Sequence, residues 1–158
     1  MQPQVDGVRK PELRLALALR GGVSLAVWMG GACAEIDALR RAGDPRHAGD
    51  DDPAVAFWRA LLEDSPYSRV VVDVMAGASA GGLNGAVFGA AIRHGFSMAD
   101  LLDVWRDVAA IDDLRRPRKP WRSLFDGDER FLDVIHARLG ELVGSAADDL
   151  TGARRRTT

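Results

Sequence analysis

The feature that most constrains this chain is an apolar run, Val70–Met75, that leads directly into Gly77-Ala78-Ser79-Ala80-Gly81. A nearly continuous valine-rich run is typical of a strand that is buried on both faces of a parallel sheet. The glycines end the strand, and the Gly- and Ala-rich stretch Leu83–Arg93 that follows predicts a helix. The segment therefore reads as strand, sharp turn and helix.

A second unit of the same kind precedes it. Leucine alternates with other residues through Leu13–Leu19, which predicts a strand, and Gly21-Gly22 ends it. Apolar positions at helical spacing then predict a helix over Ser24–Arg41 that ends at Gly43. Strands separated by helices indicate the α/β class with a parallel sheet and helices on both of its faces.

The remaining pattern is helical. Apolar spacing predicts helices over Ala54–Glu63, from Ser97 to about Ala110, and over Asp128–Val143, where Gly144 is expected to end the last one. We divide the chain into a loose leader (1–12), an α/β domain (13–145) and a polar tail (146–158). Two strands are too few for a covered sheet. Either further strands are hidden in the pattern, or the chain is the front portion of a larger α/β domain, or a partner completes the sheet.

Composition excludes several classes of protein. The 158 residues carry 21 Lys and Arg against 23 Asp and Glu, and this net charge of −2 argues against a nucleic-acid binder. The single cysteine, Cys33, excludes an internal disulfide and a cysteine-based zinc site, and the three histidines are scattered, so we expect no metal and no organic cofactor. Neither a signal peptide nor a membrane span is evident, and we expect a cytoplasmic protein.

The turn around Ser79 has the pattern G-x-S-x-G in the strand-to-helix setting that a serine nucleophile requires. Larger side chains at Gly77 and Gly81 would collide in so sharp a turn, which explains the two glycines. The Ser79 hydroxyl would then project above the sheet edge at the positive end of a helix, with the Ala80 N–H as one oxyanion donor. The alternative is a tight turn whose serine only caps the helix.

The Gly21-Gly22 turn offers further donors. If the two strands are neighbours, both turns lie at one sheet edge, where ligands of open α/β sheets gather. The N–H groups of Gly21, Gly22 and Val23 would then face Ser79. The alternatives are a phosphate-type loop that binds a nucleotide, although the spacing fits neither common nucleotide-binding pattern, and an ordinary turn.

Two stretches in this order resemble the patatin-like phospholipases, and among them the bacterial patatin-related proteins. The stretches are Leu17–Gly31, which contains Arg20-Gly21-Gly22-Val23-Ser24, and Val74–Gly85, which contains Gly77-Ala78-Ser79-Ala80-Gly81-Gly82. The resemblance spans about residues 13–145.

The resemblance implies a lipid acyl hydrolase with a Ser–Asp dyad and no histidine. By position, Ser79 is the nucleophile and the Gly21-Gly22 turn is the oxyanion hole. The chain departs from the family in its first motif, where Val23-Ser24-Leu25 replaces a third glycine followed by a basic residue and glycine. It also departs at the base, which in this family lies in an Asp-Gly motif on a strand well downstream of the serine. Asp126-Gly127 is the one Asp-Gly pair after Ser79, and it opens a predicted helix, where Asp126 or Asp128 would be an N-cap. The catalytic aspartate is therefore expected to be missing from this chain.

Several residues invite a catalytic interpretation that the pattern does not favour. Ser79, an intervening aspartate and His136 follow the order of an α/β-hydrolase triad, but His136 lies inside a predicted helix and is expected to be exposed. His94 lies at a helix end, Cys33 is expected in the core, and Asp73 either lies near the site or pairs with an arginine. Trp28 and Trp58 lie on apolar helix faces and are expected in the core.

The expected partner is a lipid or lipid-like ester, with transient contact to a membrane surface and no nucleic acid. The basic segment 115–122 would attract anionic headgroups or serve as a solvated linker. The rival to an active hydrolase is a catalytically inactive patatin-like fragment that binds lipid or a protein partner.

Overall fold

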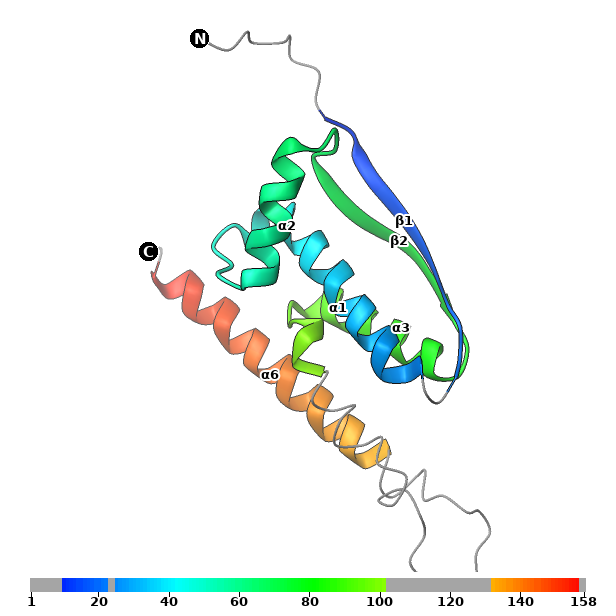
Figure 1. Ribbon diagram of the computed structural model, residues 1–158. Helices are drawn as coiled ribbons and strands as arrows, with labels where there is room; N and C mark the ends of the chain where they lie inside the picture. The colour runs from blue at the N-terminus through cyan, green and yellow to red at the C-terminus, as the bar shows by residue number, and fades with distance from the viewer. Residues whose placement is uncertain (1–9, 23–24, 102–131, 157–158) are drawn as a thin grey trace, which may run out of the picture.

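The computed structural model describes residues 10–22, 25–101 and 132–156, with side chains placed for 10–22, 25–100 and 132–145. The elements, shown in Figure 1, are β1 (Glu12–Leu19), α1 (Ala26–Ala42), η2 (Pro45–His47), α2 (Pro53–Asp64), β2 (Arg69–Gly77), α3 (Ala80–His94), η3 (Met98–Leu101) and α6 (Asp133–Arg156). The expected α/β class is confirmed.

The two strands form a parallel pair. The register runs from Glu12 opposite Arg69 to Leu19 opposite Gly77, so both strands end at the same edge. The register shifts between Leu15 and Ala16, where Asp73 is the extra residue of a β-bulge. A bulge exchanges the faces of the residues that follow it, and Val74 accordingly lies on the open face, 57% exposed, while Met75 packs on the core.

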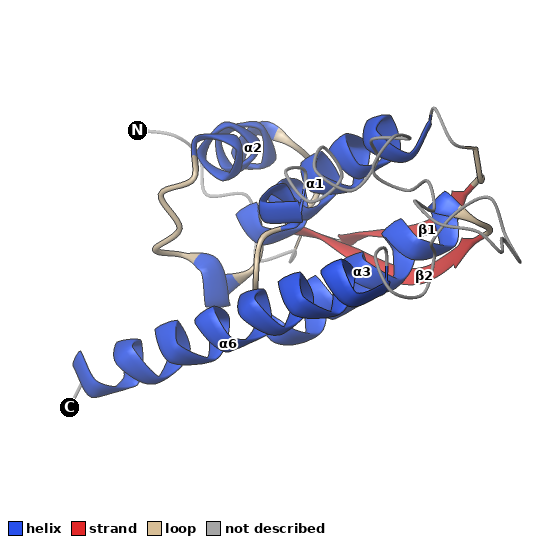
Figure 2. Ribbon diagram, turned by 90° about the horizontal axis from the view of Figure 1, so that it is seen from below, coloured by secondary structure: helices blue, strands red, loops and turns tan. Residues whose placement is uncertain are grey.

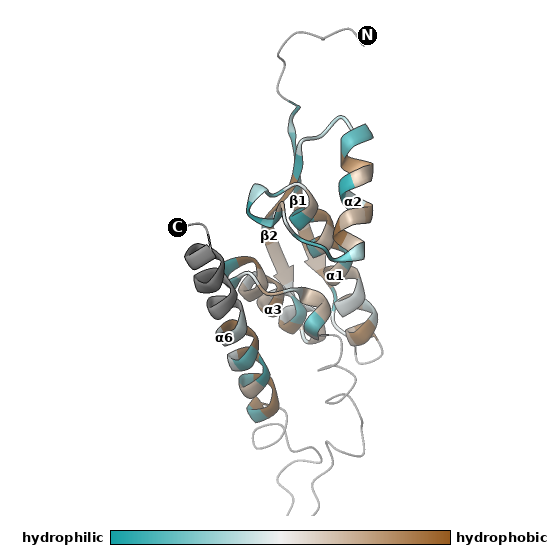
Figure 3. Ribbon diagram, turned by 90° about the vertical axis from the view of Figure 1, so that its left-hand side faces the viewer, coloured by the Kyte–Doolittle hydropathy of each residue, from teal (hydrophilic) through white to brown (hydrophobic). Residues whose placement is uncertain are grey.

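One face of the sheet is covered. Leu17, Leu19, Val72 and Met75 pack against a buried cluster that α1 and α3 supply, comprising Met29, Cys33, Val87, Phe88 and Ala91. The helices lie on the same side of the strands in Figure 1, and apolar colours predominate on β2 and α3 in Figure 3. Burial of Cys33 in this core confirms the sequence prediction.

The expectation of helices on both faces is wrong for the described residues. The second face of the sheet carries Arg14, Ala16, Ala18 and Val74, which are all exposed. The valine-rich run had suggested burial on both sides, but Asp73 and the bulge interrupt it. Within the described part of the chain, this unit is a two-stranded sheet with one helical layer.

Two helix boundaries differ from the prediction by three residues or more. Helix α3 begins at Ala80 rather than Leu83, because the turn at Ser79 starts the helix without a connecting loop. Helix α6 continues past Gly144 to Arg156 and runs alongside α3 (Figure 2). A helical glycine costs only about 1 kcal/mol relative to alanine, so Gly144 does not by itself end a helix. Residues 102–131, which include the basic segment 115–122 and Asp126, lie outside the described residues.

Candidate active site

The two glycine turns adjoin at the carboxyl edge of the sheet (Figure 1). The Ala78 N–H donates to the Leu19 carbonyl oxygen at 3.2 Å, which links the ends of β2 and β1. A Cβ atom added to Gly21 would lie 2.8 Å from the Ser79 Cβ and 2.7 Å from the Ala78 oxygen. From the sequence we expected both turns at one edge of the sheet, and the structure places them in contact with each other.

Ser79 adopts a strained backbone conformation. Its φ of 52° and ψ of −128° make it the single non-glycine residue with positive φ in the described part of the chain. Such a conformation costs about 1 to 3 kcal/mol and persists only where the surroundings impose it. Here, backbone hydrogen bonds on both sides of Ser79 impose the conformation. The Gly81 N–H donates to the Ala78 oxygen at 3.0 Å, and the Leu83 N–H donates to the Ser79 oxygen at 3.1 Å.

The serine is presented to solvent. Ser79 is exposed, it stands immediately before the first residue of α3, and it makes no side-chain cap hydrogen bond. Its hydroxyl is therefore not engaged as a helix cap, which was the alternative interpretation from the sequence.

Glycine is required on both sides of Ser79 by backbone atoms. A Cβ atom at Gly77 would lie 2.5 Å from the Gly81 carbonyl carbon, and one at Gly81 would lie 2.1 Å from the Leu19 oxygen. Both separations are far below the roughly 3.5 to 4.0 Å of favourable carbon contacts. The turn thus depends on the absence of side chains at these two positions and on the closeness of β1.

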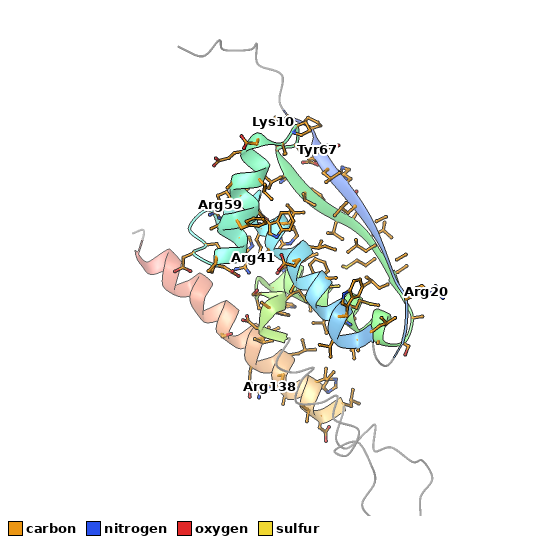
Figure 4. All side chains as sticks on the ribbon, viewed as in Figure 1. Lys10, Arg20, Arg41, Arg59, Tyr67 and Arg138 are labelled. Atoms are coloured by element: carbon orange, nitrogen blue, oxygen red, sulfur yellow. The ribbon has the colours of Figure 1, made fainter. Side chains whose placement is uncertain are left out.

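The two turns carry backbone donors. The N–H groups of Gly21, Gly22 and Ala80 donate to no backbone acceptor within the described ranges. The Ala80 N–H also lies at the N-terminus of α3, whose dipole favours negative charge nearby. Val23, the fourth expected donor, lies outside the described residues. Arg20, just before the turn, points away from the helices (Figure 4).

An apolar rim follows the Gly21-Gly22 turn. Leu25, Val27 and Trp28 at the start of α1 are 44%, 47% and 70% exposed. Leu25 lies against Gly22, since its Cδ1 would be 3.3 Å from a Cβ there. The prediction that Trp28 is a core residue is wrong, because the face of α1 that carries it is not covered by any described element. Trp58 is half-buried, and its Nε1 donates to Glu35 Oε2 at 2.9 Å.

The other candidate residues do not join this site. Arg14 Nη1 donates to both carboxylate oxygens of Asp73, at 2.8 and 3.0 Å, so Asp73 pairs with an arginine on the open sheet face. His136 is exposed on α6, as expected. His94 lies in the last turn of α3, also as expected. Asp126 lies outside the described residues.

A polar cavity of about 600 Å³ lies away from the serine. It is lined from the C-terminal ends of α1 and α3 and from the loop after α1, and its lining includes Arg41, His47, Asp50 and Asp100 but neither glycine turn. Burial lowers the pKa of His47 and raises the pKa of Asp100. Hydrogen bonds from Arg46 lower the pKa of the nearby Asp44 to about 2.

Sequence reasoning missed Asn84. This residue is 1% exposed, and its Nδ2 donates to the carbonyl oxygens of Ala26 and Ala80, each at 3.1 Å. The available signal was an amide side chain within the small and apolar stretch Ala80–Ile92, because a buried polar group requires hydrogen-bond partners.

No group of three or more His, Cys, Asp or Glu residues that could hold a metal ion occurs among the described residues. In the same part of the chain, no helix combines the length and the apolar character needed to cross a membrane.

Comparison with known proteins identifies a mycobacterial relative. The chain is 38% identical over 143 residues to the uncharacterized membrane protein Rv3479 of Mycobacterium tuberculosis. The match covers 83% of this chain, which spans 13% of the length of that curated relative. No family model matches the chain, and no solved structure matches it.

Proposed function

We propose that this chain carries the nucleophile and oxyanion-hole portion of a patatin-like lipid acyl hydrolase. The observation that supports it best is the backbone of Ser79, which is strained, exposed and in contact with a second glycine turn. Strain of this kind gathers at functional sites. A turn that served only to connect β2 to α3 would not need it.

The proposed reaction is hydrolysis of a carboxylic ester in two steps. Ser79 Oγ attacks the carbonyl carbon and gives up its proton to a base, and the alcohol leaves as the acyl group is transferred to Oγ. Water then attacks the acyl-enzyme, releases the carboxylic acid and restores the hydroxyl. The N–H groups of Gly21, Gly22, Val23 and Ala80 would stabilise the negative oxygen of each tetrahedral intermediate.

We propose that the base is an aspartate outside the described residues, and that it is missing from this chain as the resemblance leads us to expect. Asp73 is already bound by Arg14 through both carboxylate oxygens and is not available for that role. Oxyanion donors and substrate binding alone retain about 10³- to 10⁴-fold catalysis over water in serine hydrolases. We therefore expect this chain by itself to be a weak catalyst, whose Ser79 still reacts slowly with an activated probe.

The substrate class follows from the apolar rim. Leu25, Val27 and Trp28 expose apolar surface beside the Gly21-Gly22 turn, which favours an ester with a long apolar chain. Tryptophan suits the boundary between water and lipid. We propose a cytoplasmic protein that contacts the membrane surface transiently.

The test is covalent labelling of Ser79 by a fluorophosphonate probe, with the modified peptide located by mass spectrometry. We expect labelling of the wild-type chain and of the control Ser68→Ala, which removes an exposed serine at the other end of β2, and none of Ser79→Ala. An unlabelled wild-type chain would refute the proposal. If that chain also sedimented with phospholipid vesicles, the inactive lipid-binding fragment would be the better description.

A further inference from the structure

We propose that Asn84 is a positioning residue that holds the oxyanion turn against the nucleophile turn. The inference rests on the proposed function, because it concerns how the same site is kept in its reactive geometry. It starts from the burial of Asn84 and from the two carbonyl oxygens to which its amide donates.

Each acceptor is directly connected to one of the turns. Ala80 follows Ser79 in the chain and is the first residue of α3. Ala26 is the first residue of α1, and its neighbour Leu25 closes the other turn by donating its N–H to the Gly22 oxygen at 3.2 Å. One carboxamide therefore joins the beginnings of the two helices that follow the two turns.

The chemistry of the side chain suits this role. An amide presents two N–H donors, and the carbonyl groups of Ala26 and Ala80 are both acceptors. A carboxylate of the same shape would place negative charge against two carbonyl oxygens. An apolar side chain would fill the space between the helices without fixing their separation.

Small displacements matter at such a site. Donors of an oxyanion hole act at hydrogen-bond distance from the developing charge, and a misplacement of about 1 Å can cost about 100-fold in rate. The Gly21 and Ser79 turns are already in van der Waals contact, so loss of the joining amide would let them move apart rather than together.

The decisive variant is Asn84→Asp, which keeps the shape and removes both donors. We expect the maximal rate at which the fluorophosphonate labels Ser79 to fall about 10- to 100-fold. The fluorophosphonate concentration that gives half of the maximal rate should change little. Protonation of the buried carboxyl would restore one O–H donor. The ratio of variant to wild-type rates should therefore rise as the pH falls from about 8 to about 5.

The matched control is Phe88→Leu, which loosens the same helix in the core without touching the amide. Phe88 is fully buried, so this variant should be less stable yet label at nearly the wild-type rate. Equal labelling of Asn84→Asp and wild type would overturn the inference. A pH-independent ratio, or an equal loss in Phe88→Leu, would also overturn it, because either would indicate a purely structural role.

Failure of the proposed function can be distinguished from failure of this inference about Asn84. If the wild-type chain is not labelled, hydrogen exchange decides the inference separately, through the amides of Leu25 and Leu83, which donate to Gly22 and Ser79. Loss of protection at both in Asn84→Asp, with the rest of α3 unchanged, supports the joining role. Unchanged protection at both refutes it.

Discussion

Substitution of Gly81 by alanine tests the close approach of the two turns most directly. The added Cβ would lie 2.1 Å from the Leu19 oxygen, 2.5 Å from the Leu19 carbonyl carbon and 2.9 Å from the Arg20 oxygen. All three are backbone atoms, and Leu19 is held in register with Gly77 of β2. No side-chain rotation can relieve the contact, so either β1 or the start of α3 must move.

The expected cost follows from two opposing contributions. Alanine is favoured over glycine in a helix by about 1 kcal/mol. Overpacking of a rigid site typically costs about 1 to 3 kcal/mol and occasionally more, and three backbone contacts at one Cβ place Gly81 at the upper end, near 3 to 4 kcal/mol. The net destabilisation of Gly81→Ala is thus about 2 to 3 kcal/mol, a large fraction of a typical stability of about 5 to 15 kcal/mol.

The assay is urea unfolding of the full chain, followed by circular dichroism. The control is Gly89→Ala on the same helix, where the nearest atom to the new Cβ is the Met75 Cε at an ordinary 3.7 Å. That variant should be more stable than wild type by about 0.5 to 1 kcal/mol. If Gly81→Ala matched Gly89→Ala in stability, the two turns could not approach as closely as described, and the proposed site would lose its basis.

Two further predictions concern buried titratable groups. Burial lowers the pKa of His47, so the unfolded chain binds the proton more readily, and stability that is complete above about pH 6.5 should fall below it. Urea unfolding at several pH values should show a shallower decline for His47→Gln, and an unchanged decline would contradict the assignment. Burial raises the pKa of the Cys33 thiol, so a maleimide should modify it slowly in the native chain and rapidly in denaturant; equal rates would refute its place in the core.

The sequence was sufficient where the determining interactions are local. Alternating leucines fixed β1, and Gly43 and Gly95 follow the last residues of α1 and α3. The glycines around Ser79 indicated a sharp turn, because few other residues fit a turn that enters a helix at once. These features depend on backbone sterics within a few residues.

The bulge at Asp73, the exposure of Trp28 and the role of Asn84 could not be read from the pattern. Each depends on contacts with a distant segment. Asp73 has no register partner in β1 and pairs with Arg14, Asn84 donates to Ala26, and no described element covers Trp28. Hydrophobic spacing indicates that one face of a helix or strand is apolar, but it does not indicate whether another element covers that face.

By itself, the sequence determined the order of strands and helices and the two glycine turns, since these follow from local conformational preferences. Tertiary structure alone decided that the turns touch, that one face of the sheet stays open and that a buried amide joins the two helices. The physical reason is that parallel pairing brings residues about 60 positions apart to the same edge, and only their packing sets the distances between them.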